Sequence, residues 1–214
     1  MMKKLKEYII ESIKPLPKSV SGLIVFDIDD TLLRVKPDSI KIYKKDPNTG
    51  KEITLTTDEF ARDADAVNHK DWFDYRDFNN EGLVYKSIIE GTPLIKNLKI
   101  MDAYLQAGYN FCFLTARGCE DIVKQALKDF LRYKDTDGQL KALGQKFKDT
   151  LSHAVNDITK EYHGETDAIK KSNILKKLCK SHDAVVFVDD DAKNLQWARS
   201  LKLPNLKIIP AWKD

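Results

Sequence analysis

The sequence predicts an α/β protein built on a Rossmann-like, doubly wound and mainly parallel sheet. Apolar runs at 23–26, 109–114 and 184–188 have the length of buried strands, and segments with helical spacing of apolar residues separate them. Each of these runs ends in polar residues. Strands that alternate with helices favour a parallel sheet, in which such strand ends meet at one edge. The sequence therefore predicts that the polar residues after these strands lie together at one edge of the sheet.

The first half of the chain is predicted to leave this sheet soon after its first strand. The expected elements are, in order, an amphipathic helix within 1–14, the strand at 23–26, a β-hairpin from 40–44 and 52–55, and a short helix beginning at Thr56 or Thr57. Pro, Asn and Gly within 46–50 supply the hairpin turn, and Glu59 favours the helix start. We interpret 34–92 as a β-hairpin flap and small cap-like insertion.

An irregular stretch at 69–82 concentrates aromatic and acidic side chains. Packing of Trp72, Phe73, Tyr75 and Phe78 onto the sheet is the favoured interpretation, and a substrate-facing lid is the alternative. The degree to which this insertion covers the sheet edge would decide the size of ligand that can reach it.

The second half is predicted to supply the rest of the sheet and its covering helices. The expected elements are a helix from Pro93 to Gln106, the strand at 109–114, a helix at 120–133, a polar turn at 135–138, a helix around 140–147, a short strand near 151–155, a helix at 168–178, the strand at 184–188, a helix at 194–201 and a strand at 206–209. Gly108 is a typical stop for the first of these helices.

Composition limits the class of protein. The 214 residues suffice for one well-buried domain with an elaboration, so we expect a single domain over 1–214. The net charge of +3 neither requires nor excludes a polyanionic partner, and no run approaches the roughly 20 apolar residues of a membrane span. Cys112, Cys119 and Cys179 form no zinc-ligand or disulfide pattern, so a cytoplasmic location is expected.

The segment FDIDDTLL at 26–33 carries the strongest functional signal. Asp27 and Asp29 are two positions apart at the end of a strand, so their side chains can converge on one side. Two adjacent carboxylates repel each other unless a cation or a proton lies between them. The pair therefore indicates a metal-assisted catalytic site, whereas a helix cap formed by Asp30 or Thr31 is the structural alternative.

Two further strand ends add to this signal. Thr115 follows the strand at 109–114, within Thr115-Ala116-Arg117-Gly118, and Asp189, Asp190 and Asp191 follow the strand at 184–188. Taken alone, a threonine after a strand is more often a helix cap, and an acidic run can be solvated surface. Their shared position at the carboxyl ends of parallel strands favours one common site.

These motifs, in this order, resemble the haloacid dehalogenase superfamily of aspartate-nucleophile phosphohydrolases. The resemblance rests on 23–33, 113–118, a lysine near 170, and 185–194. These motifs together span the chain from about residue 20 to about residue 200. It implies that Asp27 attacks a phosphoryl group and forms an aspartyl-phosphate. It also implies that Asp29 protonates the leaving alkoxide and then activates water.

The resemblance further implies which residues hold the substrate and the metal. The implied substrate-binding residues are Thr31, Thr115, Ala116, Arg117 and a lysine at the head of the 168–178 helix. Lys171 is favoured over Lys170 because apolar residues follow it at the family's spacing of three, four and seven positions. Mg²⁺ would be held by Asp27, Asp190 and the backbone carbonyl of Asp29.

The last motif departs from the family's common Gly-Asp form. This chain has Asp189 before Asp190, and Asn194 where a second acid often lies. Asp189 is expected either to orient a metal-bound water or to assist Lys171, and the role of Asp191 stays open.

The implied function is a Mg²⁺-dependent phosphomonoester hydrolase, a phosphatase, acting on a nucleotide or another small phosphate ester. One alternative is a polynucleotide-end phosphatase in which Lys41, Lys44, Lys45 and Lys51 of the hairpin follow a phosphate backbone, although such lysines more often form a solvated face. Phosphoryl transfer to an acceptor other than water and a non-catalytic binding module are further alternatives. No membrane partner is expected.

Overall fold

A parallel sheet forms the centre of the molecule. The computed structural model describes residues 13–134 and 151–212, and over these residues the sheet has five strands in the order β10-β9-β1-β7-β8. The strands are β1 (Gly22–Phe26), β7 (Asn110–Thr115), β8 (Leu151–Ala154), β9 (Ala184–Asp189) and β10 (Leu206–Pro210). Every pairing among them is parallel. The predicted α/β class and mainly parallel sheet are confirmed.

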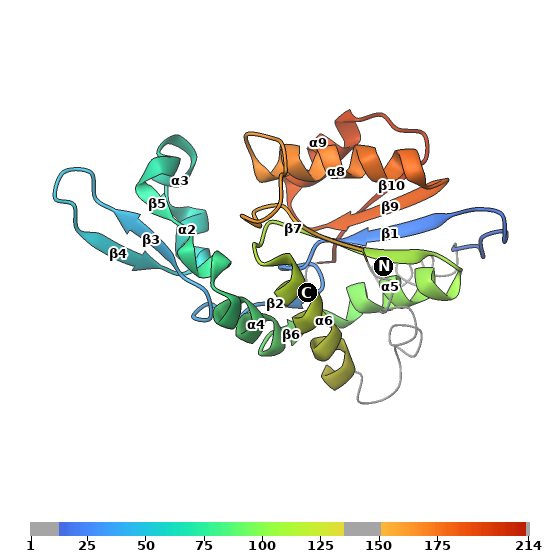
Figure 1. Ribbon diagram of the computed structural model, residues 1–214, viewed down its shortest axis with the longest axis horizontal. Coiled ribbons are helices and arrows are strands. Elements are labelled where there is room, and N and C mark those ends of the chain that lie inside the picture. The colour runs from blue at the N-terminus through green and yellow to red at the C-terminus, as the bar shows by residue number, and fades with distance from the viewer. Residues whose placement is uncertain (1–12, 135–150, 213–214) are drawn as a thin grey trace, which may run out of the picture.

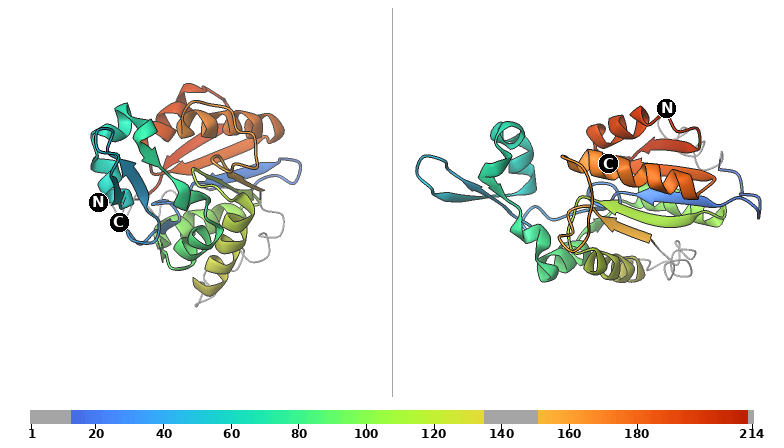
Figure 2. Two further views of the ribbon diagram at one scale, coloured as in Figure 1. Left: turned by 60° about the vertical axis from the view of Figure 1, so that its left-hand side comes forward. Right: turned by 45° about the horizontal axis from the view of Figure 1, so that its top comes forward.

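Helices cover both faces of the sheet (Figures 1 and 2). Side chains alternate between the faces of a strand, and on β1 Ile24 and Phe26 pack on one side whereas Leu23 and Val25 pack on the other. The first face is covered by α4 (Glu81–Ile89), α5 (Ile95–Gln106) and α6 (Glu120–Lys134), and the second by α8 (Asp167–Ser181) and α9 (Ala192–Ser200). This arrangement is the predicted doubly wound one.

The insertion after β1 lies beyond the carboxyl ends of the sheet strands (Figure 1). It begins and ends where β2 (Leu33–Arg34) pairs with β6 (Thr92–Pro93). Between them lie β3 (Ile42–Lys45), β4 (Glu52–Leu55), α2 (Thr57–Arg62), α3 (Asp65–Asn68), a 3-10 turn at Lys70–Trp72, β5 (Phe73–Asp74), a 3-10 turn at Arg76–Asn79, and then α4. The hairpin β3–β4 is antiparallel, as predicted, and β5 joins it as a third strand.

Local sequence signals account for much of the insertion. The Asp46 side chain accepts hydrogen bonds from the backbone amides of Asn48 and Thr49, which stabilises the hairpin turn. The Thr56 side chain accepts a hydrogen bond from the backbone amide of Glu59 and caps α2, and the Glu59 carboxylate accepts one from the backbone amide of Thr56, so the two residues form a capping box.

The aromatic residues of 69–82 behave differently from the prediction. Phe73 and Tyr75 pack edge-on against Phe60 of α2, with ring centroids 5.2 and 5.7 Å apart, and the Trp72 ring stacks on His69 at 4.0 Å. Phe78 alone of the four named rings packs against the central core cluster. The expected packing onto the sheet is therefore wrong for three of the rings, because the insertion has an aromatic core of its own.

Other differences concern element boundaries. Pro93 does not begin a helix, because it belongs to β6 and pairs with Leu33 of β2. The helix α5 begins at Ile95. The helix α4 was not predicted. The short strand near 151–155 is confirmed as β8, and Gly108, with φ +97°, follows α5. The helix predicted within 1–14 lies mostly outside the described residues, as do the turn at 135–138 and the helix at 140–147. No helix in the described part of the chain is long and apolar enough to cross a membrane.

Candidate active site

Asp27 lies at the end of β1, on the edge of the sheet that faces the insertion (Figure 1). Its backbone amide donates to the carbonyl of Val188 in β9, which continues the sheet ladder and fixes the position of the residue. The side chain is only 8% exposed. Its Oδ1 accepts a hydrogen bond from the Lys171 ammonium at 2.7 Å. A carboxylate is thus held in a buried position at a ligand-binding edge of the fold.

Lys171 connects two acidic strand ends. The side chain leaves the first turns of α8, and its ammonium also donates to Asp189 Oδ2 at 3.0 Å. Burial acts to lower the pKa of Lys171, but the carboxylates of Asp27 and Asp189 outweigh it and raise that pKa. Lys171 therefore carries its charge at neutral pH. The adjacent Lys170 contacts neither acid and donates instead to Asn156 Oδ1 at 2.6 Å.

Three carboxylates, two of them bonded to this ammonium, lie together at the strand ends. One oxygen atom from each of Asp27, Asp189 and Asp190 lies within 4.8 Å of the others, so the group can hold a metal ion. Burial raises the pKa of Asp27 well above its ordinary value; Lys171 opposes this shift, and repulsion from Asp189 and Asp29 adds to it. Lys171 cannot neutralise three acids, so the cluster has excess negative charge. A hard cation with oxygen ligands fits this donor set.

Asp189 is also held by protein hydrogen bonds. Asn194 Nδ2 donates to both of its carboxylate oxygens, at 3.1 and 3.0 Å, and the backbone amide of Asp191 donates to Oδ1 at 2.8 Å. Asp191 itself caps α9. Asn194 therefore orients an acid of the cluster. The Asp190 side chain is less buried and accepts a hydrogen bond from the hydroxyl of Thr31 at 3.4 Å.

Asp29 is held by an arginine from the next strand end. Arg117 Nε and Nη2 donate to the two Asp29 oxygens at 2.9 and 2.7 Å, in a bidentate pair. The Arg117 side chain is 2% exposed, whereas that of Asp29 is 39% exposed. Arg117 Nη1 donates to Ser87 Oγ of α4 at 2.7 Å. The structure thus brings Arg117, predicted to bind substrate, against the predicted acid and base.

The loop after β7 is held by its neighbours on both sides. Thr115 is 1% exposed, and its hydroxyl accepts a hydrogen bond from the backbone amide of Arg117 at 3.3 Å. Asn156 Nδ2 donates to the carbonyl of Ala116 at 2.7 Å. The amide of Gly118 donates to the carbonyl of Phe78, and a Cβ at position 118 would lie 3.0 Å from that oxygen. The loop is therefore fixed against the insertion.

Sequence reasoning did not find Ser87 or Asn156. Ser87 lies in a helix that was not predicted, and a serine one position before Ile88 gives no signal of its own. Asn156 follows β8, so its place at the active edge resembles that of the acids after β1 and β9. A systematic reading of every strand end would have found it.

A cavity of about 440 Å³ opens beside Asp29 and Arg117. The insertion supplies the opposite wall through Ile40, Thr57 and Phe78, and Val35 and Pro37 add apolar surface. The charged groups Asp30 and Arg34 complete the lining. The volume lies within the range of small-molecule sites, and one end of the cavity carries the candidate acid and base.

Neither a protein-family model nor a curated protein matches the chain. Among solved structures, a chain of one described as "Structure of the Pnkp1/Rnl/Hen1 RNA repair complex" is similar, with 16% sequence identity and a TM-score of 0.46. The similarity covers 95% of this chain and 47% of that chain, so this chain spans about half the length of the structure that it matches. A similarity of this size carries no argument about function, which has to come from the site itself.

Proposed function

We propose that the chain is a Mg²⁺-dependent phosphomonoester hydrolase of the haloacid dehalogenase superfamily, acting on a nucleotide or another small phosphate ester. The observation that carries the proposal is the buried Asp27, held at 2.7 Å by Lys171 within a cluster of three carboxylates at the sheet edge. Excess negative charge of this kind is costly in a structural core, and a site for phosphoryl transfer explains it.

Asp27 is the nucleophile of the proposed reaction. One carboxylate oxygen attacks phosphorus, a new bond forms between that oxygen and phosphorus, and the bond between phosphorus and the leaving oxygen breaks. The Lys171 ammonium lies where it can attract the phosphoryl oxygens while it holds the nucleophile. A water molecule then attacks phosphorus of the aspartyl-phosphate, which releases inorganic phosphate and restores Asp27.

Asp29 moves the proton in both steps. As a carboxylic acid it protonates the leaving alkoxide, and as a carboxylate it takes the proton from the attacking water. Arg117 fixes the direction of this side chain through both oxygens, and each oxygen keeps a second lone pair for the reacting group. The 39% exposure of the Asp29 side chain leaves it open to substrate and water.

The charged cluster would hold the metal. Asp27 and Asp190 are the proposed carboxylate ligands, with the Asp29 carbonyl as a third, and Asp189 keeps Lys171 in place. When bound, Mg²⁺ would neutralise charge on the phosphoryl group and the nucleophile, which otherwise repel each other.

The cavity beside Asp29 supports a small organic leaving group. Its 440 Å³ and its apolar wall, with the Phe78 ring, suit a nucleoside or a group of similar size, whereas Arg34 and Asp30 supply polar contacts. Thr115 and Ala116 belong to the loop proposed to contact the phosphate.

Phosphate release from p-nitrophenyl phosphate and a panel of nucleotides, with Mg²⁺ or with EDTA, tests this function. We expect Mg²⁺-dependent release that Asp27→Asn abolishes. Asp183→Asn is the matched control, because Asp183 precedes β9, carries the same charge and bonds only to Ser21 among the contacts described. If wild-type protein and Asp27→Asn are equally inactive on every ester, the proposed phosphatase function loses its support. Addition of a competing alcohol would separate hydrolysis from phosphoryl transfer.

A further inference from the structure

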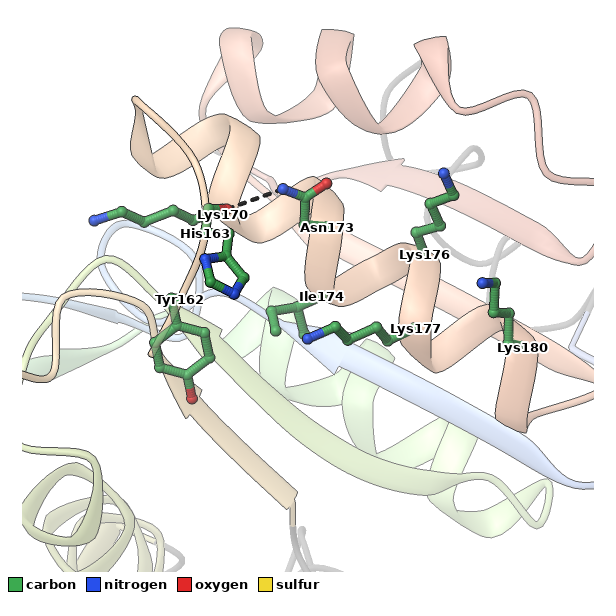
Figure 3. A pocket seen from close by; sticks show the side chains of 8 residues that line it. All are labelled: Tyr162, His163, Lys170, Asn173, Ile174, Lys176, Lys177 and Lys180. Atoms are coloured by element: carbon green, nitrogen blue, oxygen red, sulfur yellow. Dashed lines mark hydrogen bonds between the residues drawn. The ribbon is translucent and has the colours of Figure 1, made fainter. Parts of the chain in front are cut away.

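A groove lined by lysines runs along α8 (Figure 3). Its volume is about 240 Å³, and its charged and aromatic lining comprises Lys170, Lys176, Lys177, Lys180, Tyr162 and His163. The lysines recur over ten positions of the helix, which corresponds to about 15 Å at 1.5 Å per residue. No carboxylate lines the groove within the described ranges, so its charge is positive along this length.

Three of these lysines have no acidic partner in the part of the chain that the structure describes. Lys176, Lys177 and Lys180 are exposed, and no carboxylate lies within 4 Å of their ammonium groups. On the hairpin, Lys44 is paired with Asp63 and Asp65 at 2.8 and 2.7 Å and Lys41 with Asp38, whereas Lys45 and Lys51 have no carboxylate within 4 Å among the described residues. The groove on α8 thus brings three unpaired lysines together along one helix.

Hydrogen bonds through Lys170 link one end of the groove to the loops of the candidate active site. Lys170 lines the groove, and its ammonium donates to Asn156 Oδ1, while Asn156 Nδ2 donates to the carbonyl of Ala116. The next residue along α8, Lys171, contacts Asp27. One helix therefore supplies both the lysine at the nucleophile and the lysines of the groove.

We propose that this groove binds the phosphodiester backbone of a single-stranded polynucleotide whose terminal phosphate enters the site at Asp27. The inference rests on the proposed phosphatase function and names its substrate class. Several ammonium groups along one helix can contact successive phosphates of a backbone, and contacts of this kind supply most non-specific affinity for nucleic acid. The 15 Å length would accommodate a few nucleotides next to the terminal one.

The shape and lining of the groove favour a polynucleotide over a membrane surface. Lys176, Lys177 and Lys180 border a concave surface, whereas a bilayer presents a plane (Figure 3). None of the exposed large apolar residues of the described chain lines the groove, so nothing there would insert among lipids. Tyr162 and the exposed His163 offer rings at one end, and bases stack on such rings without regard to sequence.

Binding is tested apart from catalysis with an oligonucleotide of about 12 nucleotides that lacks a terminal phosphate, as RNA and as DNA. Fluorescence anisotropy would compare wild-type protein with Lys177→Gln/Lys180→Gln and with Lys99→Gln/Lys128→Gln. The control pair removes the same charge from α5 and α6 on the opposite face of the sheet. Each lost phosphate contact lowers the slope of log K against log salt concentration by about 0.7, so the loss of two lysines should lower that slope by about 1.4. If the variant and the wild-type protein bind equally at 1 M salt, the variant should then bind about 25-fold more weakly at 0.1 M salt.

Equal losses in the two double variants would overturn the proposal, and so would displacement of the oligonucleotide by polyglutamate as effectively as by unlabelled RNA or DNA.

Catalysis supplies the second readout. The groove variant should raise KM for an oligonucleotide with a terminal phosphate and leave hydrolysis of p-nitrophenyl phosphate unchanged, because Lys177 and Lys180 do not contact the cluster at Asp27. A parallel loss on both esters would contradict the groove as a strand-binding surface. If wild-type protein hydrolyses neither ester, the proposed phosphatase function fails, whereas the anisotropy result still decides whether the groove binds nucleic acid.

Discussion

Replacement of Lys171 by methionine tests the charge balance of the site. Lys171 is 3% exposed and donates to two carboxylates that are 8% and 0% exposed, so its removal leaves Asp27 and Asp189 buried without their cation. Breaking a buried ion pair by removing one partner costs about 3–5 kcal/mol of stability. We expect Lys171→Met to lower the free energy of unfolding by that amount in metal-free protein.

The neighbouring lysine is a matched control. Lys170 contacts Asn156 and lies 3.9 Å from Asp167, and its side chain is 21% exposed. Lys170→Met removes the same charge one residue away but leaves the carboxylate cluster intact, so we expect a loss below about 1 kcal/mol. Urea denaturation followed by circular dichroism, in EDTA, measures both values.

Addition of Mg²⁺ makes the prediction more specific. A cation that binds the folded cluster but not the unfolded chain stabilises the protein. This stabilisation should be larger in Lys171→Met, because loss of the ammonium makes the net charge of the cluster more negative by one unit. Phosphatase activity should be lost in this variant because the phosphoryl oxygens lose their ammonium partner. If the two methionine variants are equally stable in EDTA, the cluster does not depend on Lys171 and the charge argument is wrong.

Three further predictions concern other parts of the site and the insertion. Because burial raises the pKa of Asp27 above its ordinary value of about 3.9, the folded state binds more protons than the unfolded state above that pH. The free energy of unfolding of metal-free wild-type protein, relative to that of Asp27→Asn, should therefore fall as the pH rises above about 4. Urea titrations at several pH values measure this difference. A difference that does not change with pH would contradict the raised pKa. Ser87→Ala leaves Arg117 Nη1 buried without this acceptor, so we expect a loss of about 2 kcal/mol and a lower kcat on p-nitrophenyl phosphate, and unchanged kcat would argue against positioning by Arg117. Thr56→Ala removes a helix cap of the insertion and should lower stability by about 1 kcal/mol in thermal unfolding, with no change of kcat on the same ester.

The central sheet and the acidic strand ends could be predicted because their signals are local. Apolar runs such as 184–188 have the length and composition of a buried strand wherever they occur, and Thr56 with Glu59 identifies a helix start within four residues. The convergence of Asp27 with Asp190 then followed from a general property of parallel sheets. The grouping of these acids at one edge of the sheet could therefore be predicted from the sequence.

The missing parts depend on contacts between distant segments. The helix α4 has a mixed pattern, and its Ser87 acquires importance only through Arg117, thirty positions away. The aromatic rings near 72–78 have the composition of a sheet-packing segment, but Phe73 and Tyr75 pack instead against Phe60 of the insertion. Composition predicts that such rings will be buried, but it does not predict which part of the protein they pack against.

Contacts from the insertion connect the cavity with the proposed acid and base, Asp29. Phe78 lines the cavity, and its backbone carbonyl accepts the amide of Gly118 in the loop that carries Arg117. Ser87, a few residues later, accepts from Arg117, which in turn orients Asp29. A ligand that displaces Phe78 would therefore disturb the loop that positions Asp29. The segment that lines the cavity thus also holds the proposed acid and base in place.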